Sequence, residues 1–165
     1  MSEAKAALLE AYRNEHAGLG AGLQALTQML DRLQEGRPAP GAVRDAERFF
    51  QQVMIPHAEW EELTFYPAAG ELLRQHGDVN AAMVLDHREI AARVADLLAL
   101  LQRIEAGERD PALVDRARLL GYQIRALVEV HCRKEEEIYC ALVRRHLSDG
   151  DVVRALAIGD QLGHD

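Results

Sequence analysis

Apolar residues recur at steps of three and four along most of this chain. In an α-helix, with about 3.6 residues per turn, that spacing places the apolar side chains on one face. The pattern predicts four long helices at about 2–34, 42–75, 79–106 and 110–146, and a short amphipathic helix after residue 150. Since β-branched runs are few and only five prolines occur, the sequence favours an all-α fold.

Capping and breaking residues set the expected ends of these helices. Ser2 is a suitable N-cap for the first helix, because its short oxygen side chain can accept a hydrogen bond from the first turn. Asp110 followed by Pro111 is a suitable start for the fourth helix. Gly107 is expected to end the third helix, and the stretch 36–41, rich in Pro and Gly, predicts a loop after the first.

Prolines and glycines also lie inside two of the predicted helices. Pro56 and Pro67 lack a backbone N–H, so we expect them to kink the second helix or split it. The stretch 76–78 (His-Gly-Asp) predicts its stop. Gly18, Gly20 and Gly22 weaken the first helix locally, and we expect them to mark close packing beside a functional site.

The apolar face of the fourth predicted helix is interrupted by two polar residues. His131 and Glu135 stand one turn apart in the middle of this face. Its apolar positions are Leu120, Ile124, Leu127, Ile138 and Leu142. Burying a carboxylate without a partner costs several kcal/mol, so either a protonated group or a metal ion must compensate it.

The same interruption occurs on the other helices. His57 and Glu61 stand one turn apart on the second, whose inward positions include Phe50, Val53 and Phe65. Single histidines lie on the inward faces of the first and third helices, at His16 and His87. Two helical hairpins therefore repeat, with offsets of 71 residues between the lone histidines and 74 between the His-x-x-x-Glu histidines.

An up-down-up-down four-helix bundle brings these polar residues to one level of its core. The helix lengths on either side of the loops place all of them at matching heights. The predicted cluster consists of His16, His57, Glu61, His87, His131 and Glu135. One alternative reading is a set of buried His–Glu ion pairs without metal, but it leaves four imidazoles and two carboxylates with few hydrogen-bond partners.

Length and charge narrow the class of protein. The 165 residues suggest one domain, divided into a bundle at 1–147 and a short helix with a tail at 148–165. A formal charge of −8 argues against nucleic acid or an anionic membrane as partner, and no apolar run is long enough to span a bilayer. With no signal-peptide pattern, and with Cys132 and Cys140 unsuited to pairing within one helix, we expect a soluble cytoplasmic protein with reduced thiols.

Imidazole and carboxylate together suit iron, manganese or zinc. Four histidines and two carboxylates are too many for one tetrahedral zinc, but they suit two metals bridged by both carboxylates, with positions left open for a small ligand. We therefore predict a centre of two metal ions bridged by both carboxylates, with iron, manganese and zinc as the candidate metals.

The motifs around these positions resemble the hemerythrin-like HHE cation-binding family over about residues 1–147. They are Asn-Glu-His at 14–16, His-Ala-Glu-Trp-Glu-Glu-Leu-Thr-Phe-Tyr-Pro at 57–67, Asp-His-Arg-Glu at 86–89 and His-Cys-Arg-Lys-Glu-Glu-Glu at 131–137. The resemblance implies a four-helix bundle with a non-haem di-iron site, and its ligands fall on the six residues of the predicted cluster.

The chain departs from oxygen-carrying hemerythrins at one ligand position. Those proteins have a second histidine one turn from the third-helix ligand, whereas Met83 and Ala91 stand one turn either side of His87 here. We therefore expect a protein that binds or senses O2, or that handles iron and redox stress, and not one for simple reversible O2 storage. The alternatives are an enzyme that decomposes peroxide, a mononuclear or storage protein, and a metal-free interaction module. No protein partner is predicted.

Several neighbouring residues receive a structural interpretation. Glu15, Asp86, Glu62 and Glu136 adjoin predicted ligands and are expected to face solvent, as is Glu137. The tyrosines Tyr12 and Tyr139 lie one turn from predicted ligands and are expected to pack in the core. The alternative is that a tyrosine hydroxyl donates to a metal-bound oxygen species or lines its pocket. The Cys132 side chain is expected to point about 100° away from that of His131.

Overall fold

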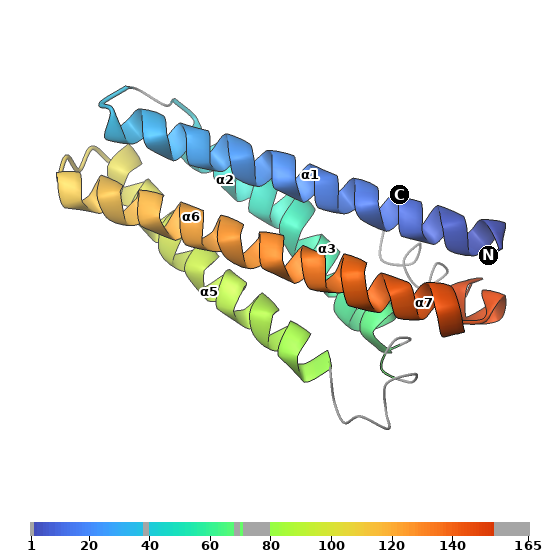
Figure 1. The fold of residues 1–165 in the computed structure, drawn as a ribbon. Helices are drawn as coiled ribbons and strands as arrows, with labels where there is room; N and C mark the ends of the chain where they lie inside the picture. Colours follow the sequence, from blue (N-terminus) through green and yellow to red (C-terminus); the bar gives the residue numbers. More distant parts are fainter. Residues whose placement is uncertain (1, 38–39, 68–69, 71–79, 154–165) are drawn as a thin grey trace.

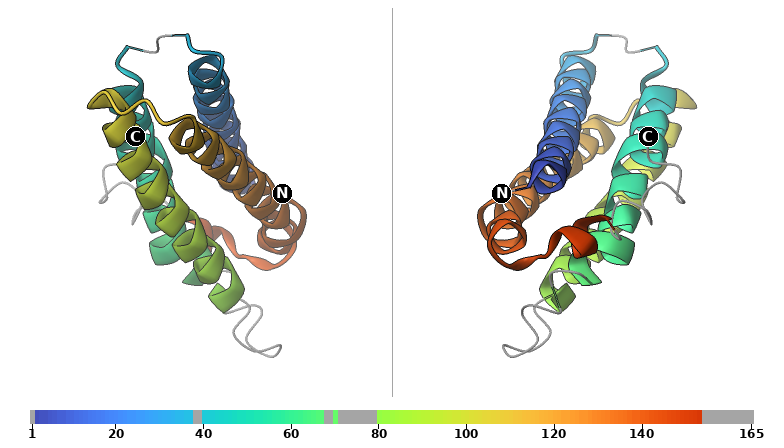
Figure 2. Two further views of the ribbon diagram at one scale, coloured as in Figure 1. Left: turned by 90° about the vertical axis from the view of Figure 1, so that its left-hand side faces the viewer. Right: turned by 90° about the vertical axis from the view of Figure 1, so that its right-hand side faces the viewer.

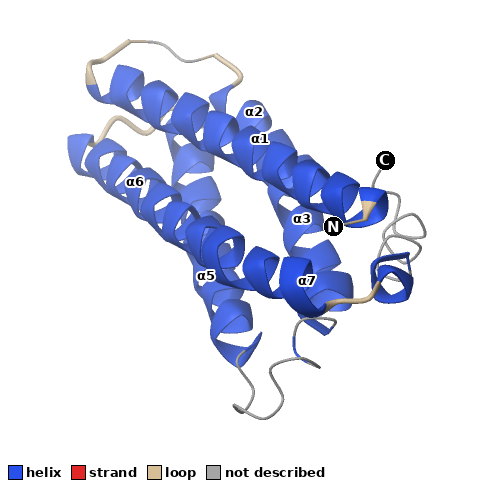
Figure 3. Ribbon diagram, turned by 45° about the vertical axis from the view of Figure 1, so that its right-hand side comes forward, coloured by secondary structure: helices blue, strands red, loops and turns tan. Residues whose placement is uncertain are grey.

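The computed structural model describes residues 2–37, 40–67, 70 and 80–153, and within these ranges it contains helices and no strand (Figure 1, Figure 3). The first rod is α1 (Glu3–Gln34). The second joins α2 (Ala42–Phe49), the π-helical turn Phe50–Met54, α3 (Ile55–Trp60) and the π-helical turn Glu61–Phe65. The third is α5 (Asn80–Glu105), and the fourth joins α6 (Pro111–Lys134), the π-helical turn Glu135–Tyr139 and α7 (Cys140–His146). The all-α prediction is confirmed.

The four rods lie side by side and run alternately up and down (Figure 1). Seen along the bundle, α1 and α6 form one side, while α2–α3 and α5 form the other (Figure 2). Residues 149–153 are helical and lie against the start of α1, where the Ser2 hydroxyl donates to Asp149 at 2.6 Å. Val152 is fully buried there, so this segment covers one end of the bundle. Leu156 and Ile158, predicted on the same short helix, lie outside the described residues.

The predicted capping residues occupy their expected places. The Ser2 side chain accepts from the backbone N–H of Lys5 at 3.3 Å, and Asp110 accepts from Ala112 at 3.0 Å. Gly107 follows α5 with a φ of 99°, a left-handed conformation that glycine adopts at little cost. The stop predicted at 76–78 lies outside the described residues.

Pro56 does not split the second rod. The chain is helical at Pro56 and at Pro67, and each proline lies two residues after the last residue of a π-helical turn. In these turns a backbone N–H bonds to the carbonyl five residues earlier, as Ile55 does to Phe50 and Tyr66 to Glu61. The widened turn allows the helix to continue past Pro56, so of the predicted kink or split the split does not occur there; residues 68 and 69, which follow Pro67, lie outside the described residues.

The π-helical turns also shift the inward face by about one residue. Val53 and Ile138 were predicted to point inward, but their exposed fractions are 42% and 52%. Met54 and Tyr139, each one residue later, are buried instead. A turn with one additional residue rotates everything after it relative to an uninterrupted α-helix, which explains both errors.

The core consists of two apolar clusters with a polar layer between them. The cluster toward the loops at 35–41 and 106–110 is mainly aliphatic and includes Leu23, Leu30 and Leu101. The cluster toward the other end is rich in aromatic residues and includes Tyr12, Trp60 and Phe65. The buried histidines and glutamates lie between these clusters, shielded from water on both sides.

The three glycines of α1 do not act as one group. Among the described residues, a Cβ atom added to Gly18 or Gly20 would meet nothing within 4 Å. A Cβ added to Gly22 would lie 2.1 Å from the ring of Phe49. Close packing is therefore confirmed at Gly22 alone, and its partner is an apolar residue of α2 rather than a residue of the polar layer.

Candidate metal centre

The six polar residues predicted from the helical pattern meet in the middle of the bundle. One comes from each of α1 and α5, and two come from each of the other rods. Glu61 and Glu135 are fully buried, and the exposed fractions of His16, His57 and His131 are 7%, 7% and 4%. The side chain of His87 is 10% exposed. The site is therefore nearly closed to bulk solvent, and its charges have to be compensated inside the protein.

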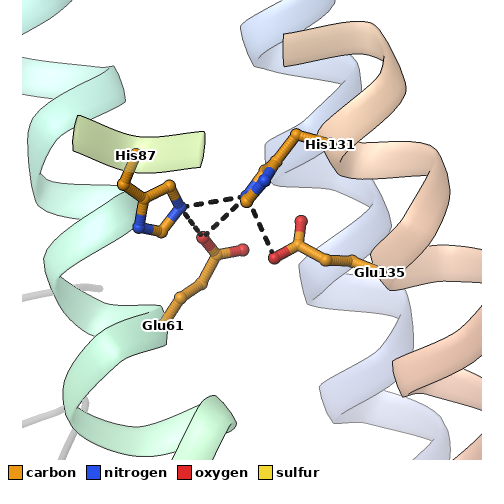
Figure 4. A group of neighbouring side chains, drawn as sticks. All are labelled: Glu61, His87, His131 and Glu135. Atoms are coloured by element: carbon orange, nitrogen blue, oxygen red, sulfur yellow. Dashed lines mark hydrogen bonds and ion pairs between the residues drawn. The ribbon is translucent and has the colours of Figure 1, made fainter. Parts of the chain in front are cut away.

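The two oxygens of Glu61 face different histidine pairs. Oε1 lies 3.0 Å from Nε2 of His57 and 3.8 Å from Nε2 of His16. Oε2 lies 3.2 Å from Nε2 of His87 and 3.9 Å from Nε2 of His131 (Figure 4). Glu61 is therefore placed between a first pair, His16 with His57, and a second pair, His87 with His131.

Glu135 repeats this arrangement from the opposite side of the bundle. Its Oε2 lies 3.4 Å from Nε2 of His16, and its Oε1 lies 3.2 Å from Nε2 of His131. The Nε2 atoms of His87 and His131 are only 2.9 Å apart, which suits two ligands of one ion (Figure 4). Each histidine pair thus has one oxygen from each carboxylate.

The donor atoms of this cluster fit a bound cation. Within the part of the chain that the structure describes, several of them are buried without a hydrogen-bond partner: Nε2 of His16, Nε2 of His57, Oε2 of Glu61 and Oε2 of Glu135. Leaving such atoms unpaired costs free energy, and a metal ion satisfies them together. Ligand atoms from Glu61, His87, His131 and Glu135 lie within 4.8 Å of one another, as do ligand atoms from His16, His57 and Glu61.

Protons carry the positive charge of this cluster when no cation is bound. Burial lowers the pKa of His57, but the hydrogen bond with Glu15 and the nearby charge of Glu61 outweigh it and raise the value to about 9. Burial also lowers the pKa of His131, and contacts with Glu135 and Glu61 raise it to about 10. Burial raises the pKa of Glu61, yet the surrounding histidines hold it well below its usual range. The site favours positive charge beside two carboxylates, which is the role a metal ion fills.

Four acidic residues, which we call the outer carboxylates (Glu15, Glu62, Asp86 and Glu136), bind the other nitrogen of each histidine. Nδ1 of His57 donates to Glu15 at 2.6 Å, and Nδ1 of His131 donates to Asp86 at 3.0 Å. A carboxylate on Nδ1 fixes the ring orientation and leaves Nε2 free to bind a metal.

The two remaining outer carboxylates complete a ring around the bundle. Nδ1 of His87 donates to Glu62 at 2.8 Å, and Nδ1 of His16 donates to Glu136 at 2.9 Å. The histidines of the second, third and fourth rods thus each donate to an acid on the preceding rod. His16 of α1 donates to an acid on the fourth rod, which closes the ring. The expectation that these acids face solvent is confirmed for Glu62 and Glu136, whose side chains are 39% and 41% exposed, but their contacts with the histidines were not predicted.

Two buried tyrosines donate to the central carboxylates. The Tyr12 hydroxyl donates to Oε1 of Glu61, and the Tyr66 hydroxyl donates to Oε1 of Glu135 at 2.5 Å. Burial and the charges of Glu61 and Glu135 raise the pKa of both phenols, so they stay protonated. Tyr12 packs in the core as expected, and its hydroxyl group in addition binds a carboxylate of the site. Tyr66 was missed, and the π-helical turn that begins at Glu61 is what brings it inward.

Cys132 lies closer to the site than the sequence indicated. Its sulfur and the ligand atoms of His16 and Glu135 lie within 4.8 Å of one another. The expected direction, about 100° from His131 on α6, does not include how closely α1 approaches on that side. Cys140 is 1% exposed, and burial raises the pKa of its thiol to about 11.

A cavity of about 240 Å³ adjoins the second histidine pair. His57, His87 and His131 reach it, and the rest of its lining is mainly apolar. The apolar and small residues of the lining include Phe50, Met54, Ala58, Ile90, Ala91 and Val94. Ala91 stands one turn after His87, at one of the two places where an oxygen carrier of the resembled family would have its second histidine. Its small side chain leaves open space there.

Comparison with known proteins gives one result. Searches of curated proteins and of solved structures found no significant match. None of the helices in the described ranges is long and apolar enough to cross a membrane. The model of one family, described as the hemerythrin HHE cation binding domain, matches residues 7–143 and therefore most of the chain. Together with the buried histidine and glutamate cluster, which can hold a cation, this match shows that the chain belongs to the hemerythrin HHE cation-binding family.

Proposed function

We propose that this protein holds two iron ions in the middle of the bundle and uses them to bind or sense O2, or to respond to iron and redox stress. The observation that carries the proposal is the shared position of the two buried carboxylates. Glu61 and Glu135 each direct one oxygen toward the first histidine pair and the other toward the second. This is the arrangement that two carboxylate-bridged ions require.

The donor set favours iron, with manganese or zinc as substitutes. In this proposal His16 and His57 hold one ion, His87 and His131 hold the other, and both glutamates bridge. Nitrogen and oxygen donors in this proportion suit these metals. Iron supplies open coordination positions at which O2 or peroxide binds and exchanges electrons with the metal.

The surrounding residues support binding of a small ligand. The cavity reaches His87 and His131 and has a mainly apolar lining, so a small uncharged molecule such as O2 can enter it. The Tyr66 hydroxyl lies 3.4 Å from Nε2 of His87 and 3.2 Å from Nε2 of His131. It can therefore offer a proton or a hydrogen bond on this side of the site. Both cysteines are free thiols, which supports placing the protein in the reducing cytoplasm.

Metal stoichiometry tests the proposal directly. We expect metal-free protein, loaded with excess Fe(II) without oxygen and then freed of unbound iron, to retain two irons per chain. Glu61→Ala and Glu135→Ala should each lower that value, because both ions share these carboxylates. Retention of one iron by the unaltered protein would replace the paired centre by a mononuclear one, and retention of none would overturn the proposal.

A peroxide-decomposing enzyme is the second candidate. It is favoured by the absence of a histidine at Met83 and Ala91, which leaves the His87 side of the site with fewer ligands and beside the cavity. This function predicts many turnovers of hydrogen peroxide per iron centre, lost in His57→Ala. A single stoichiometric reaction would exclude catalysis and leave binding or sensing.

A further inference from the structure

Cys132 stands where the first rod meets the fourth, beside the first histidine pair. It follows His131 on α6, but its sulfur faces the side of the site that α1 provides. The sulfur and ligand atoms of His16 and Glu135 all lie within 4.8 Å of one another. That separation is about what donors of one ion show, since metal–donor bonds of about 2.0–2.3 Å put opposite ligands up to about 4.6 Å apart.

The other two members of this group point to a ligand independently of the cysteine. The side chains of His16 and Glu135 are 4% and 0% exposed. In the described part of the molecule, Nε2 of His16 and Oε2 of Glu135 are buried and accept or donate no hydrogen bond. Nδ1 of His16 is already bound to Glu136, so Nε2 is the nitrogen that faces the sulfur and the carboxylate.

We infer that Cys132 binds, as a thiolate, the metal ion that His16 and His57 hold. This inference rests on the proposed function and adds a sulfur ligand to one of its two ions. On binding, the thiol loses its proton to solvent and the sulfur forms a bond to the metal, with no change of oxidation state. An open surface pocket lined by Cys132, Arg13, Glu129 and Glu136 gives the proton a path to water.

The sulfur makes the two ions chemically different. The residue that corresponds to Cys132 in the first hairpin is Ala58, directly after His57. Ala58 lines the cavity beside His87 and offers no ligand atom in its side chain. In this inference the ion of the first pair gains a soft sulfur donor that the ion of the second pair lacks, and residues of both pairs line the cavity. Thiolate-preferring ions such as Zn(II) and Co(II) should fill the sulfur-containing position first.

Cobalt spectroscopy tests the sulfur–metal bond. We expect protein loaded with Co(II) without oxygen to show a near-ultraviolet sulfur-to-cobalt charge-transfer band. The band should be absent in Cys132→Ser and present in Cys140→Ala, which removes the other thiol. Moving the thiol, with Ala58→Cys in the Cys132→Ser protein, should restore a band from the second ion. An identical spectrum in Cys132→Ser and the unaltered protein would overturn the inference.

Thiol labelling provides a second measurement that does not depend on cobalt. In Cys140→Ala, Cys132 is the single remaining cysteine, and we expect Zn(II) to slow its reaction with a maleimide by roughly tenfold or more. An unchanged labelling rate, at a zinc content of one or more per chain, would contradict the inference.

Metal analysis separates this inference from the proposed function. If the unaltered protein takes up no metal, both are overturned. If it takes up two ions and Cys132→Ser does so with the same spectrum, the paired site stands and the sulfur ligand is excluded. Circular dichroism of each variant shows whether the helices have formed, and Cys132→Ala repeats the test should Cys132→Ser not fold.

Discussion

The two hairpins of this bundle carry the same ligands in different surroundings. The first hairpin consists of α1 with α2–α3, and the second consists of α5 with α6–α7. At offsets of 71 and 74 residues their core positions correspond and are buried in both, as in the pairs Leu30 with Leu101 and Phe50 with Ile124. In each hairpin the His-x-x-x-Glu histidine donates to the acid that precedes the lone histidine.

The correspondence breaks at three positions next to the ligands. The first hairpin has Tyr12, Ala58 and Tyr66 at these positions. The second hairpin has Met83, Cys132 and Cys140 at the corresponding positions. Both phenols that bind the central carboxylates thus come from the first hairpin, and all three sulfur atoms come from the second. The repeat supplies two similar sets of candidate ligands, and these neighbours make the surroundings of the two sets unequal.

Removing one histidine from each hairpin should have the largest effect. We expect His57→Ala to weaken binding of the first ion and His131→Ala that of the second, each by more than about 100-fold, because a direct ligand counts for more than its hydrogen-bonded support. Titration of the metal-free variants with Fe(II) measures this. His146→Ala, an exposed histidine at the end of α7, serves as the control. Loss of both ions in each variant would show that the two positions are not separable.

Removing either phenol should lower the stability of the metal-free protein. Tyr12→Phe and Tyr66→Phe each leave a buried carboxylate without its hydroxyl donor, and a hydrogen bond to a charged group contributes about 1.5–3 kcal/mol. Urea unfolding with a chelator present measures the free energy of unfolding. Tyr122→Phe is the matched control, because its hydroxyl binds Asp31 in an exposed position. Equal stability of all three variants would deny the phenols a role in holding the carboxylates.

Neutralising corresponding outer carboxylates should weaken metal binding by about 10- to 100-fold. Glu15→Gln and Asp86→Asn remove the charge that each histidine Nδ1 faces. We expect the larger effect for Asp86, whose side chain is 28% exposed against 47% for Glu15. Competition with a coloured chelator measures the affinity. Glu137→Gln, a 71% exposed neighbour of Glu136, should leave it unchanged.

The smallest expected effect comes from making the first helix more like the third. Gly20 corresponds to Ala91, and a Cβ at Gly20 would meet nothing within 4 Å among the described residues. Gly20→Ala should stabilise the protein by roughly 0.5–1 kcal/mol, because alanine favours the helix, and should leave metal binding unaltered. Thermal unfolding measures the gain. Gly22→Ala should instead destabilise, since its Cβ would overlap the ring of Phe49.

The helical period is enough to place the six clustered residues, because each lies on the apolar face of its rod. A histidine or glutamate on such a face is visible in the sequence as a polar interruption. Their burial and proximity agree with that prediction. Their roles as ligands, and the division of the chain at 147, stay predictions.

The outer carboxylates could not be placed in the same way. Glu15 and Glu62 adjoin inward residues, so a single helix directs them about 100° away from the core. They reach histidines because the neighbouring rod approaches on that side, and a pattern along one helix contains no information about its neighbour. The available signal was their recurrence, since Asp86 and Glu136 stand at the corresponding places of the second hairpin.

The π-helical turns limited the rest of the prediction. A single inserted residue rotates the following face, and neither Val53 nor Ile138 shows this in its own residue type. Tyr66 was missed for the same reason. Two of the three π-helical turns in the described ranges begin at Glu61 and Glu135, so the period failed next to the site itself.

The ring of histidine–carboxylate bonds has a consequence for the ancestry of the fold. One hairpin contains one internal bond of this kind, as from His57 to Glu15, and it shares the others with its neighbour, as from His87 to Glu62. Two identical copies of the first hairpin would therefore supply every ligand and close the same ring. A duplicated and fused hairpin gene could therefore encode the complete ring, and later substitutions in one copy could then have made the surroundings of the two histidine pairs different.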